Sequence, residues 1–195
     1  MITDSIPRAK TKKQEYLLSD ALRTIKPNLP RTLLAHGRLL ETVMASENPK
    51  EIELVCNLIA AEVSNAFGIE APTVKVLGVR PHRVDDGVCI YQKFGDYDLQ
   101  TGQIRLWMRT ARLKKVTSFG ALLNTLCHEL CHHLDVVELG FSNTPHTRGF
   151  FERTALIYHH IKDTPLRPLI WIKQSDGTFR FDWGRMMSSG NSIND

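Results

Sequence analysis

His128-Glu129-Leu130-Cys131-His132 is the stretch of this 195-residue chain that decides which fold and which chemistry to expect. It has the form H-E-x-x-H. On an α-helix, residues four apart lie on the same face, so the imidazoles of His128 and His132 can point at one metal ion. Glu129 lies about 100° further round the helix, where its carboxylate can reach a water molecule beside the metal without binding the metal. Two imidazoles and one carboxylate of this kind make up most of a hydrolytic zinc site.

The residues around the motif predict that it lies on a helix of about residues 118–137. Thr117 or Ser118 can cap the start of this helix, and Gly140 ends the pattern. Apolar residues recur between them at helical spacing: Phe119, Leu122, Leu123, Leu126, Leu130 and Leu134. The alternative interpretation is a helix with a histidine-rich exposed face and no metal. A third ligand candidate downstream favours the metal site.

Three residues are candidates for the third protein ligand that a catalytic zinc site needs. His146 follows the turn-rich stretch 140–145 and opens a second segment with helical periodicity, at about residues 146–162. A helix–loop–helix can fold this imidazole back against the first pair. Glu152 lies inside the second helix, and Asp135 lies one turn beyond His132, where it could bind the metal or support a ligand. The order of preference is His146, then Glu152, then Asp135.

The motif, followed by His146-Thr147-Arg148-Gly149-Phe150, resembles the SprT-like zincin metallopeptidases. That family pairs H-E-x-x-H with a downstream histidine that is followed four residues later by phenylalanine. Residues 101–106, TGQIRL, are similar to the short strand that runs along the active-site cleft in the family. The resemblance covers roughly residues 50–162. It implies an α+β fold with a zincin-like metallopeptidase core, in which a small mixed or antiparallel sheet packs on the active-site helix and on a backing helix.

One departure from the family pattern concerns DNA. Many full SprT-like proteins carry a Cys-rich zinc ribbon after the protease core, but no cysteine follows Cys131 in this chain. The family's association with DNA therefore transfers poorly. A basic cluster precedes the predicted metal helix: Arg105, Arg109, Arg112, Lys114 and Lys115. It could contact phosphates, but a solvated basic loop is the favoured interpretation, because the net charge of only +4 is a mild bias.

The resemblance implies a zinc-dependent peptidase that acts on a protein or peptide substrate. One Zn²⁺ per chain would be held by His128, His132 and His146. Glu129 would act as general base on a water activated by the metal, and would later pass a proton to the leaving amine. A side-chain donor could help the metal to stabilise the oxyanion. The candidates in the last predicted helix are Tyr158, His159 and His160, although an ordinary surface or core position is the favoured interpretation for each.

The strand at residues 102–109 has two interpretations. Ile104, Arg105 and Leu106 would bind the substrate backbone if the substrate added a strand at a free edge. The other interpretation is an ordinary core strand. His133, next to the ligand His132, projects about 100° away round the helix. We expect it to be solvated or hydrogen-bonded rather than to bind the metal.

Two further classes of function stay open. One is a zinc-binding interaction or regulatory domain without peptidase activity, although a purely structural site has no need of Glu129. The other is a DNA-associated protease, for which strong, salt-dependent DNA binding would be the evidence. A hydrolase of non-peptide amides would use the same zinc chemistry.

The cysteines and the N-terminus bear on the compartment. Cys56, Cys89, Cys127 and Cys131 form no C-x-x-C pair. We expect all four to be reduced, and Cys127 and Cys131, four apart on one helix, to be small buried apolar residues. The N-terminus has no hydrophobic signal core, and no apolar run approaches the roughly 20 residues of a membrane span. These features predict a soluble cytoplasmic protein with no membrane contact.

The rest of the chain divides into four parts. We expect an N-terminal arm and helical extension at 1–48, the zincin-like core at 49–165, a hairpin at 166–187 around Asp176-Gly177, and a disordered tail at 188–195. Residues 1–13 are predicted to be a flexible arm. Helices are predicted at about 14–26, 31–46 and 49–67, and strands at 72–79, 87–93 and 102–109. A hydrophobic content of 42% suffices for one sizeable core.

Overall fold

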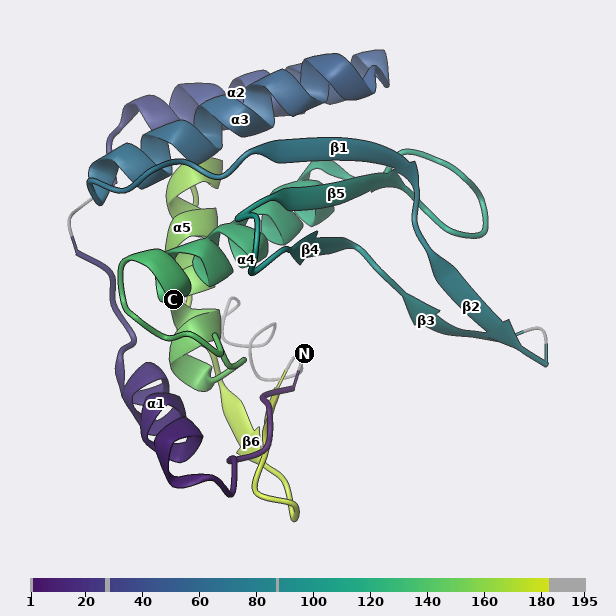
Figure 1. The fold of residues 1–195 in the computed structure, drawn as a ribbon. Helices are drawn as coiled ribbons and strands as arrows, with labels where there is room; N and C mark the ends of the chain where they lie inside the picture. The colour runs from purple at the N-terminus through teal and green to yellow at the C-terminus, as the bar shows by residue number, and fades with distance from the viewer. Residues whose placement is uncertain (1, 27–28, 87, 183–195) are drawn as a thin grey trace, which may run out of the picture.

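The fold is shown in Figure 1 as a computed structural model that describes residues 2–26, 29–86 and 88–182. It is an α+β arrangement of helices around small sheets. The helices are α1 Lys10–Ala21, α2 Thr32–Val43, α3 Pro49–Ala66, α4 Phe119–Val137 and α5 Arg148–Lys162, with a 3₁₀ turn at Met44–Ser46. The strands are β1 Val74–Val79, β2 His82–Asp85, β3 Val88–Gln92, β4 Gly95–Tyr97, β5 Ile104–Arg109, β6 Trp171–Lys173 and β7 Phe179–Phe181.

A three-stranded mixed sheet with the order β1-β5-β4 lies at the centre of the fold. β5 pairs in parallel with β1 and antiparallel with β4, so it is the middle strand. Side chains alternate across a strand, and one face of the sheet is covered: its buried residues are Val74, Val76, Ile104, Leu106 and Met108. α4 packs against β4 and β5. The sheet thus places β4 directly beside the helix that carries the H-E-x-x-H motif (Figure 1).

The two edges of this sheet differ. At the β1 edge, Asn57 of α3 accepts a hydrogen bond from the backbone N–H of Val74 and donates one to its carbonyl, both at 2.9 Å. Glu53, also on α3, accepts from the N–H of Val76 at 2.9 Å. An unpaired strand edge is a template for another strand, and these bonds remove that property from β1. The opposite edge belongs to β4.

The long helices begin where capping residues predict. Asn48 caps α3 by accepting from the N–H of Lys50, and Pro49 occupies the first helical position. Ser118 caps α4, and Thr147 caps α5 by accepting from the N–H of Phe150 at 3.0 Å. The apolar faces of α2, α3, α4 and α5 then meet in one core with the covered face of the sheet.

The C-terminal hairpin forms a separate sheet rather than extending the central one. β6 and β7 pair antiparallel, and Trp171 and Phe181 pack on Phe150 and Phe151 of α5. Ile2 forms a bridge with Arg180 of β7. The predicted flexible arm is therefore wrong for its first described residues, because backbone pairing holds them against the hairpin. The predicted tail at 188–195 lies outside the described residues.

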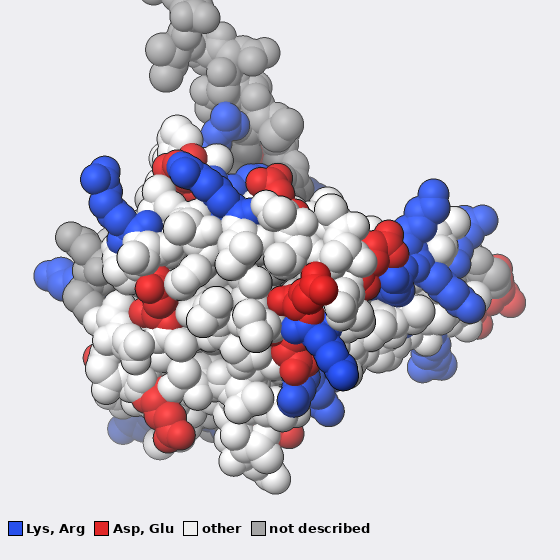
Figure 2. Space-filling model, turned by 90° about the horizontal axis from the view of Figure 1, so that it is seen from above, with Lys and Arg blue, Asp and Glu red and all other residues white. Residues whose placement is uncertain are grey.

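A second hairpin, β2–β3, stands away from the body of the molecule in Figure 1. Its apolar side chains Val84, Ile90 and Tyr91 are more than half exposed. Figure 2 shows Lys and Arg side chains gathered at this end of the molecule, with Asp and Glu among them. None of the helices in the described ranges combines the length and apolar character that crossing a membrane requires.

The elements predicted from periodicity are present with small shifts of their bounds, with two exceptions. α1 begins before the predicted start at residue 14 and ends at Ala21. Beyond Ala21 the chain is extended, and the guanidinium of Arg153 donates hydrogen bonds to the backbone carbonyls of Ser19 and Leu22. β2 and β4 were not predicted. Both are short, and short strands carry little periodic signal.

Candidate metal centre

Three histidines converge in a cleft where α4 meets the loop that precedes α5. His128 and His132 lie one turn apart on α4, and His146 lies in the loop before α5. The Nε2 atom of His128 is 3.2 Å from Nε2 of His132 and 3.1 Å from Nε2 of His146. Nitrogens bound to one tetrahedral zinc at about 2.0–2.1 Å would lie about 3.3 Å apart. The three imidazoles are therefore close enough to hold one metal ion.

The rival third ligands are engaged elsewhere. Glu152 accepts hydrogen bonds from Arg23 at 2.9 Å and from the indole of Trp171 at 3.1 Å. Asp135 is fully buried and paired with Arg153, whose Nη2 lies 2.7 and 3.0 Å from its two oxygens. The structure thus brings His146, and neither carboxylate, to the α4 pair.

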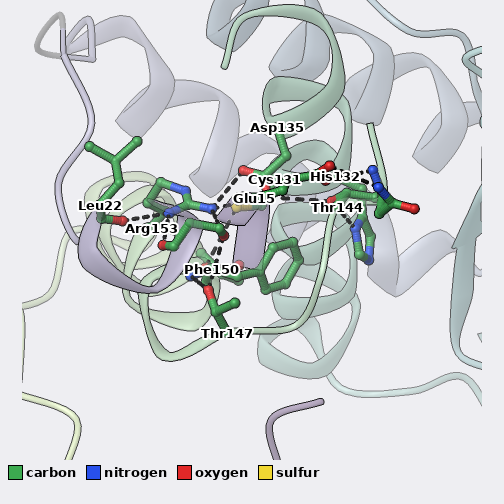
Figure 3. Close-up of polar contacts among 12 residues, drawn as sticks. Glu15, Leu22, Cys131, His132, Asp135, Thr144, Thr147, Phe150 and Arg153 are labelled. Atoms are coloured by element: carbon green, nitrogen blue, oxygen red, sulfur yellow. Dashed lines mark hydrogen bonds and ion pairs between the residues drawn. The ribbon is translucent and has the colours of Figure 1, made fainter. Parts of the chain in front are cut away.

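Figure 3 shows the polar contacts that connect Asp135 to His132 through Thr144. Nδ1 of His132 lies 2.7 Å from Oγ1 of Thr144, and that hydroxyl donates to Asp135 at 3.4 Å. A hydroxyl that donates to a carboxylate can accept from an Nδ1–H. The arrangement therefore favours the tautomer of His132 whose Nε2 lone pair is free for a metal. Thr144 is held at φ 35°, a strained conformation for a β-branched residue.

Asp4 gives His146 a similar support. Its Oδ2 accepts from the backbone N–H of His146 at 2.8 Å and lies 3.5 Å from Nδ1 of the ring. Burial raises the pKa of Asp4, but the hydrogen bonds from His146 outweigh it, so the net pKa is lowered. The carboxylate thus faces Nδ1 and leaves Nε2 on the side of the other two histidines. Asp4 could not be predicted from local sequence patterns, because it lies 142 positions from its partner.

Phe150 forms an apolar floor under the three imidazoles. Its ring centroid lies 4.9 Å from that of His128, 4.6 Å from His132 and 5.1 Å from His146. This contact gives a physical reason for the phenylalanine four residues after His146. Burial lowers the pKa of His128 to about 3 and of His132 to about 2. Both rings are therefore neutral near pH 7, which is the form that binds metals.

Glu129 lies in the same cleft and is only 5% exposed. Burial raises its pKa to about 8, with a further contribution from the charge of Asp96. The backbone of β4 passes over it at Gly95: a Cβ there would lie 2.9 Å from Oε1 of Glu129 and 2.6 Å from Thr125. A glycine is thus required for β4 to approach α4 this closely.

β4, and not β5, is the strand that borders the cleft. The cleft has a volume of about 380 Å³, and the three residues of β4 line it together with the histidines and Glu129. The prediction that Ile104, Arg105 and Leu106 offer a free edge is wrong. β5 is paired on both sides, Ile104 and Leu106 are fully buried, and Arg105 pairs with Asp96 on the other face. An isolated glycine among strand-forming residues was the signal that could have found β4.

The remaining candidate residues from the sequence lie in different surroundings. His133 is hydrogen-bonded as predicted, to the Tyr97 hydroxyl at 3.1 Å and the Glu70 carbonyl at 2.8 Å. Tyr158 and His159 line a cavity beside His128, whereas His160 contacts the Pro30 carbonyl at 2.9 Å and lines a different one. All four cysteines are free. Cys56, Cys127 and Cys131 are buried and Cys89 is exposed, and burial raises the pKa of the Cys56 and Cys131 thiols to about 12.

Comparison with protein-family models, with curated proteins and with solved structures found no match for this chain. The interpretation of the site therefore rests on its own residues. The donor set fits zinc, because three imidazoles converge through Nε2 and two of them have an oxygen facing Nδ1.

Proposed function

We propose that this chain is a zinc-dependent metallopeptidase that hydrolyses peptide bonds in protein or peptide substrates. One observation carries the proposal: three imidazole nitrogens converge beside Glu129, under a strand with a free edge. The SprT-like sequence pattern supports the same function and a zincin-like core.

His128, His132 and His146 would hold one zinc ion per chain. A bound zinc ion supplies a Lewis acid that makes water a better nucleophile near neutral pH and polarises a carbonyl. Three histidine ligands leave a fourth position of a tetrahedral site open. His₃ sites also accept other divalent ions, so metal identity is tested together with activity.

Glu129 is positioned to act as the general base and general acid of the reaction. Its side chain projects from α4 next to His128 and lines the cleft, where Gly95 of β4 approaches it closely. As a carboxylate it can accept a proton from the attacking water, and as a carboxylic acid it can donate one to the leaving amine. A bound cation would lower its pKa from the value near 8 that burial produces, and so favour the carboxylate at neutral pH.

The free edge of β4 is the surface that would hold the substrate backbone. An extended peptide can add to such an edge through main-chain hydrogen bonds. At the other edge of the sheet, side chains of α3 already accept hydrogen bonds from backbone N–H groups of β1. Among the described strands, β4 is therefore the edge of this sheet that is available to a peptide. Gly95 would bring that peptide within reach of Glu129.

Metal content and proteolysis together test the proposal. We expect about one zinc per chain in wild type and in Glu152→Ala, and loss of the metal in His146→Ala. Wild type should degrade an unfolded protein substrate, and Glu129→Gln, with its zinc retained, should not. Absence of stoichiometric metal after zinc add-back would overturn the metal site. Bound zinc without hydrolysis would favour the inactive interaction or regulatory domain.

Recruitment by DNA is the weaker alternative. Lys and Arg gather around the β2–β3 end of the molecule (Figure 2). However, Arg105 pairs with Asp96, and Arg109 pairs with Glu47 at 2.8 Å, so part of the predicted basic cluster is already neutralised. Only affinity for DNA that falls steeply with salt would raise this alternative above the simple peptidase.

A further inference from the structure

A second cavity adjoins the metal centre on the far side of His128. It lies between the first half of α4 and the middle of α5, and has a volume of about 380 Å³. His128 lines both this cavity and the cleft that holds Glu129. The two spaces therefore share His128 as a wall, so a group in the second cavity would lie beside one of the three converging histidines.

The walls of this cavity are mostly apolar, with the polar side chains of Asn124, Thr154, Tyr158 and His159 among them. Ala121 of α4 and Ala155 of α5 face it with small side chains, and Phe151, Leu169 and Phe181 supply the larger surfaces. Among the described residues that line it, none is Asp, Glu, Lys or Arg. Mostly apolar walls without a charged side chain among the described residues favour an apolar occupant over a charged one, because a charged group there would lose its hydration without an oppositely charged partner.

The C-terminal hairpin completes this cavity and joins it to the metal centre. Phe181 of β7 packs edge-on against Phe151 at 5.5 Å between ring centroids. Phe151 in turn stacks on the metal ligand His146 at 5.9 Å. An aromatic wall thus runs from the hairpin to the histidines. The hairpin strands β6 and β7 lie outside the segment of roughly residues 50–162 that resembles the SprT-like family.

We propose that this cavity is a specificity pocket that binds a large apolar side chain of the substrate, such as Leu or Phe, next to the scissile bond. The proposal rests on the peptidase function proposed above. A volume of about 380 Å³ is near the lower end for small-molecule sites, which suits one side chain better than an extended ligand. β4 would hold the backbone, and the pocket would select the residue beside the bond that is cut.

Binding can be measured without turnover. Zinc-loaded Glu129→Gln should bind peptides that differ at one position, Phe or Leu against Ala, with roughly 10- to 100-fold preference for the large residue. Adding Ala121→Phe, which fills the pocket from α4, should reduce that preference to near unity. Ala155→Phe fills it from α5 and guards against local disruption by the first variant. Ala35→Phe, on the exposed face of α2, is the matched control and should keep the preference.

Cleavage of a mixed peptide library by wild type then separates the two proposals. We expect cuts beside Leu or Phe, with the preference in kcat/KM lost in Ala121→Phe while cleavage beside Ala persists. Cleavage without preference, or an equal loss for all peptides in both filling variants, would overturn the pocket and leave the peptidase function standing. Failure of zinc-loaded wild type to cut any peptide would overturn the proposed function and the pocket with it.

Discussion

Two carboxyl groups on α4, Glu129 and Asp135, are both buried, but their hydrogen-bond partners and pKa values differ. Asp135 is fully buried, and Arg153 and Thr144 bond to its oxygens. Glu129 is 5% exposed, and the influences on its pKa are burial and the charges of Asp96 and Lys93, with no hydrogen bond from any described residue. Burial raises both pKa values, to about 6 for Asp135 and to about 8 for Glu129.

This difference separates a structural carboxylate from one available for chemistry. A buried charge is tolerated when it is paired and hydrogen-bonded. Asp135 meets that condition and serves as an anchor for Thr144 and His132. Glu129 does not, and strongly perturbed groups of this kind in a cleft are candidates for acid–base catalysis. Loss of function and loss of stability should therefore come from two different carboxyl groups of the same helix.

The largest effect is expected for Glu129→Gln. Removal of the general base should lower kcat/KM for peptide hydrolysis by about 10²–10⁴-fold, while zinc content is kept. Its free energy of unfolding should not fall, because the amide has nearly the same shape and no buried charge. Steady-state kinetics, elemental analysis and chemical denaturation measure the three quantities. A clear loss of stability would show that Glu129 is structural, like Asp135.

Arg153→Leu should produce the opposite result. Leaving Asp135 buried without its partner should lower the free energy of unfolding by roughly 3–5 kcal/mol, as measured by urea denaturation. The double variant Asp135→Leu, Arg153→Leu removes both charges and should recover part of that loss. If the double variant is no better than Arg153→Leu, the loss comes from packing around α1 and α5 rather than from an unpaired charge.

Thr144→Val tests the hydrogen-bonded connection between Asp135 and His132. It keeps the shape of the side chain but removes the hydroxyl between His132 and Asp135, so zinc affinity should fall about 10- to 100-fold. Competition with a chelator measures this affinity. Thr144→Ser, which keeps the hydroxyl, should restore most of it. Equal affinity in both variants would mean that Thr144 supports the loop and not the tautomer of His132.

Gly95→Ala should give the smallest effect. The new methyl group would push against Glu129 and Thr125, so we expect roughly tenfold lower kcat/KM and about 1 kcal/mol lower stability. Gly78→Ala in β1 is the control, because a Cβ there meets nothing within 4 Å. Identical activity in both variants would show that the closeness of β4 to Glu129 is unimportant for turnover.

Much of the fold could be predicted from local patterns. The bounds of α3, α4 and α5 follow from caps at Asn48, Ser118 and Thr147 and from helical periodicity. The α+β class and the hairpin at Asp176-Gly177 also follow from local signals. β4 could not be predicted with any force: three residues are too few for periodicity, and its place at the edge depends on pairing with β5.

The sequence by itself determined the chemistry that is available. H-E-x-x-H sets the spacing of His128, His132 and Glu129, because helix geometry fixes residues four apart on one face. Only the tertiary structure decided which downstream group joins them. His146 approaches because Thr147 caps α5 beneath it and Phe150 packs against all three rings, whereas Glu152, on the same helix, faces Arg23 and Trp171.

The supports of the site were likewise decided by the fold. Asp4 meets His146, and β4 replaces β5 at the cleft. The physical reason is one of range. Helix periodicity and capping act within a few residues, whereas the cluster of three histidines, its supporting hydrogen bonds and the edge position of β4 among the described strands depend on packing between segments far apart in the chain.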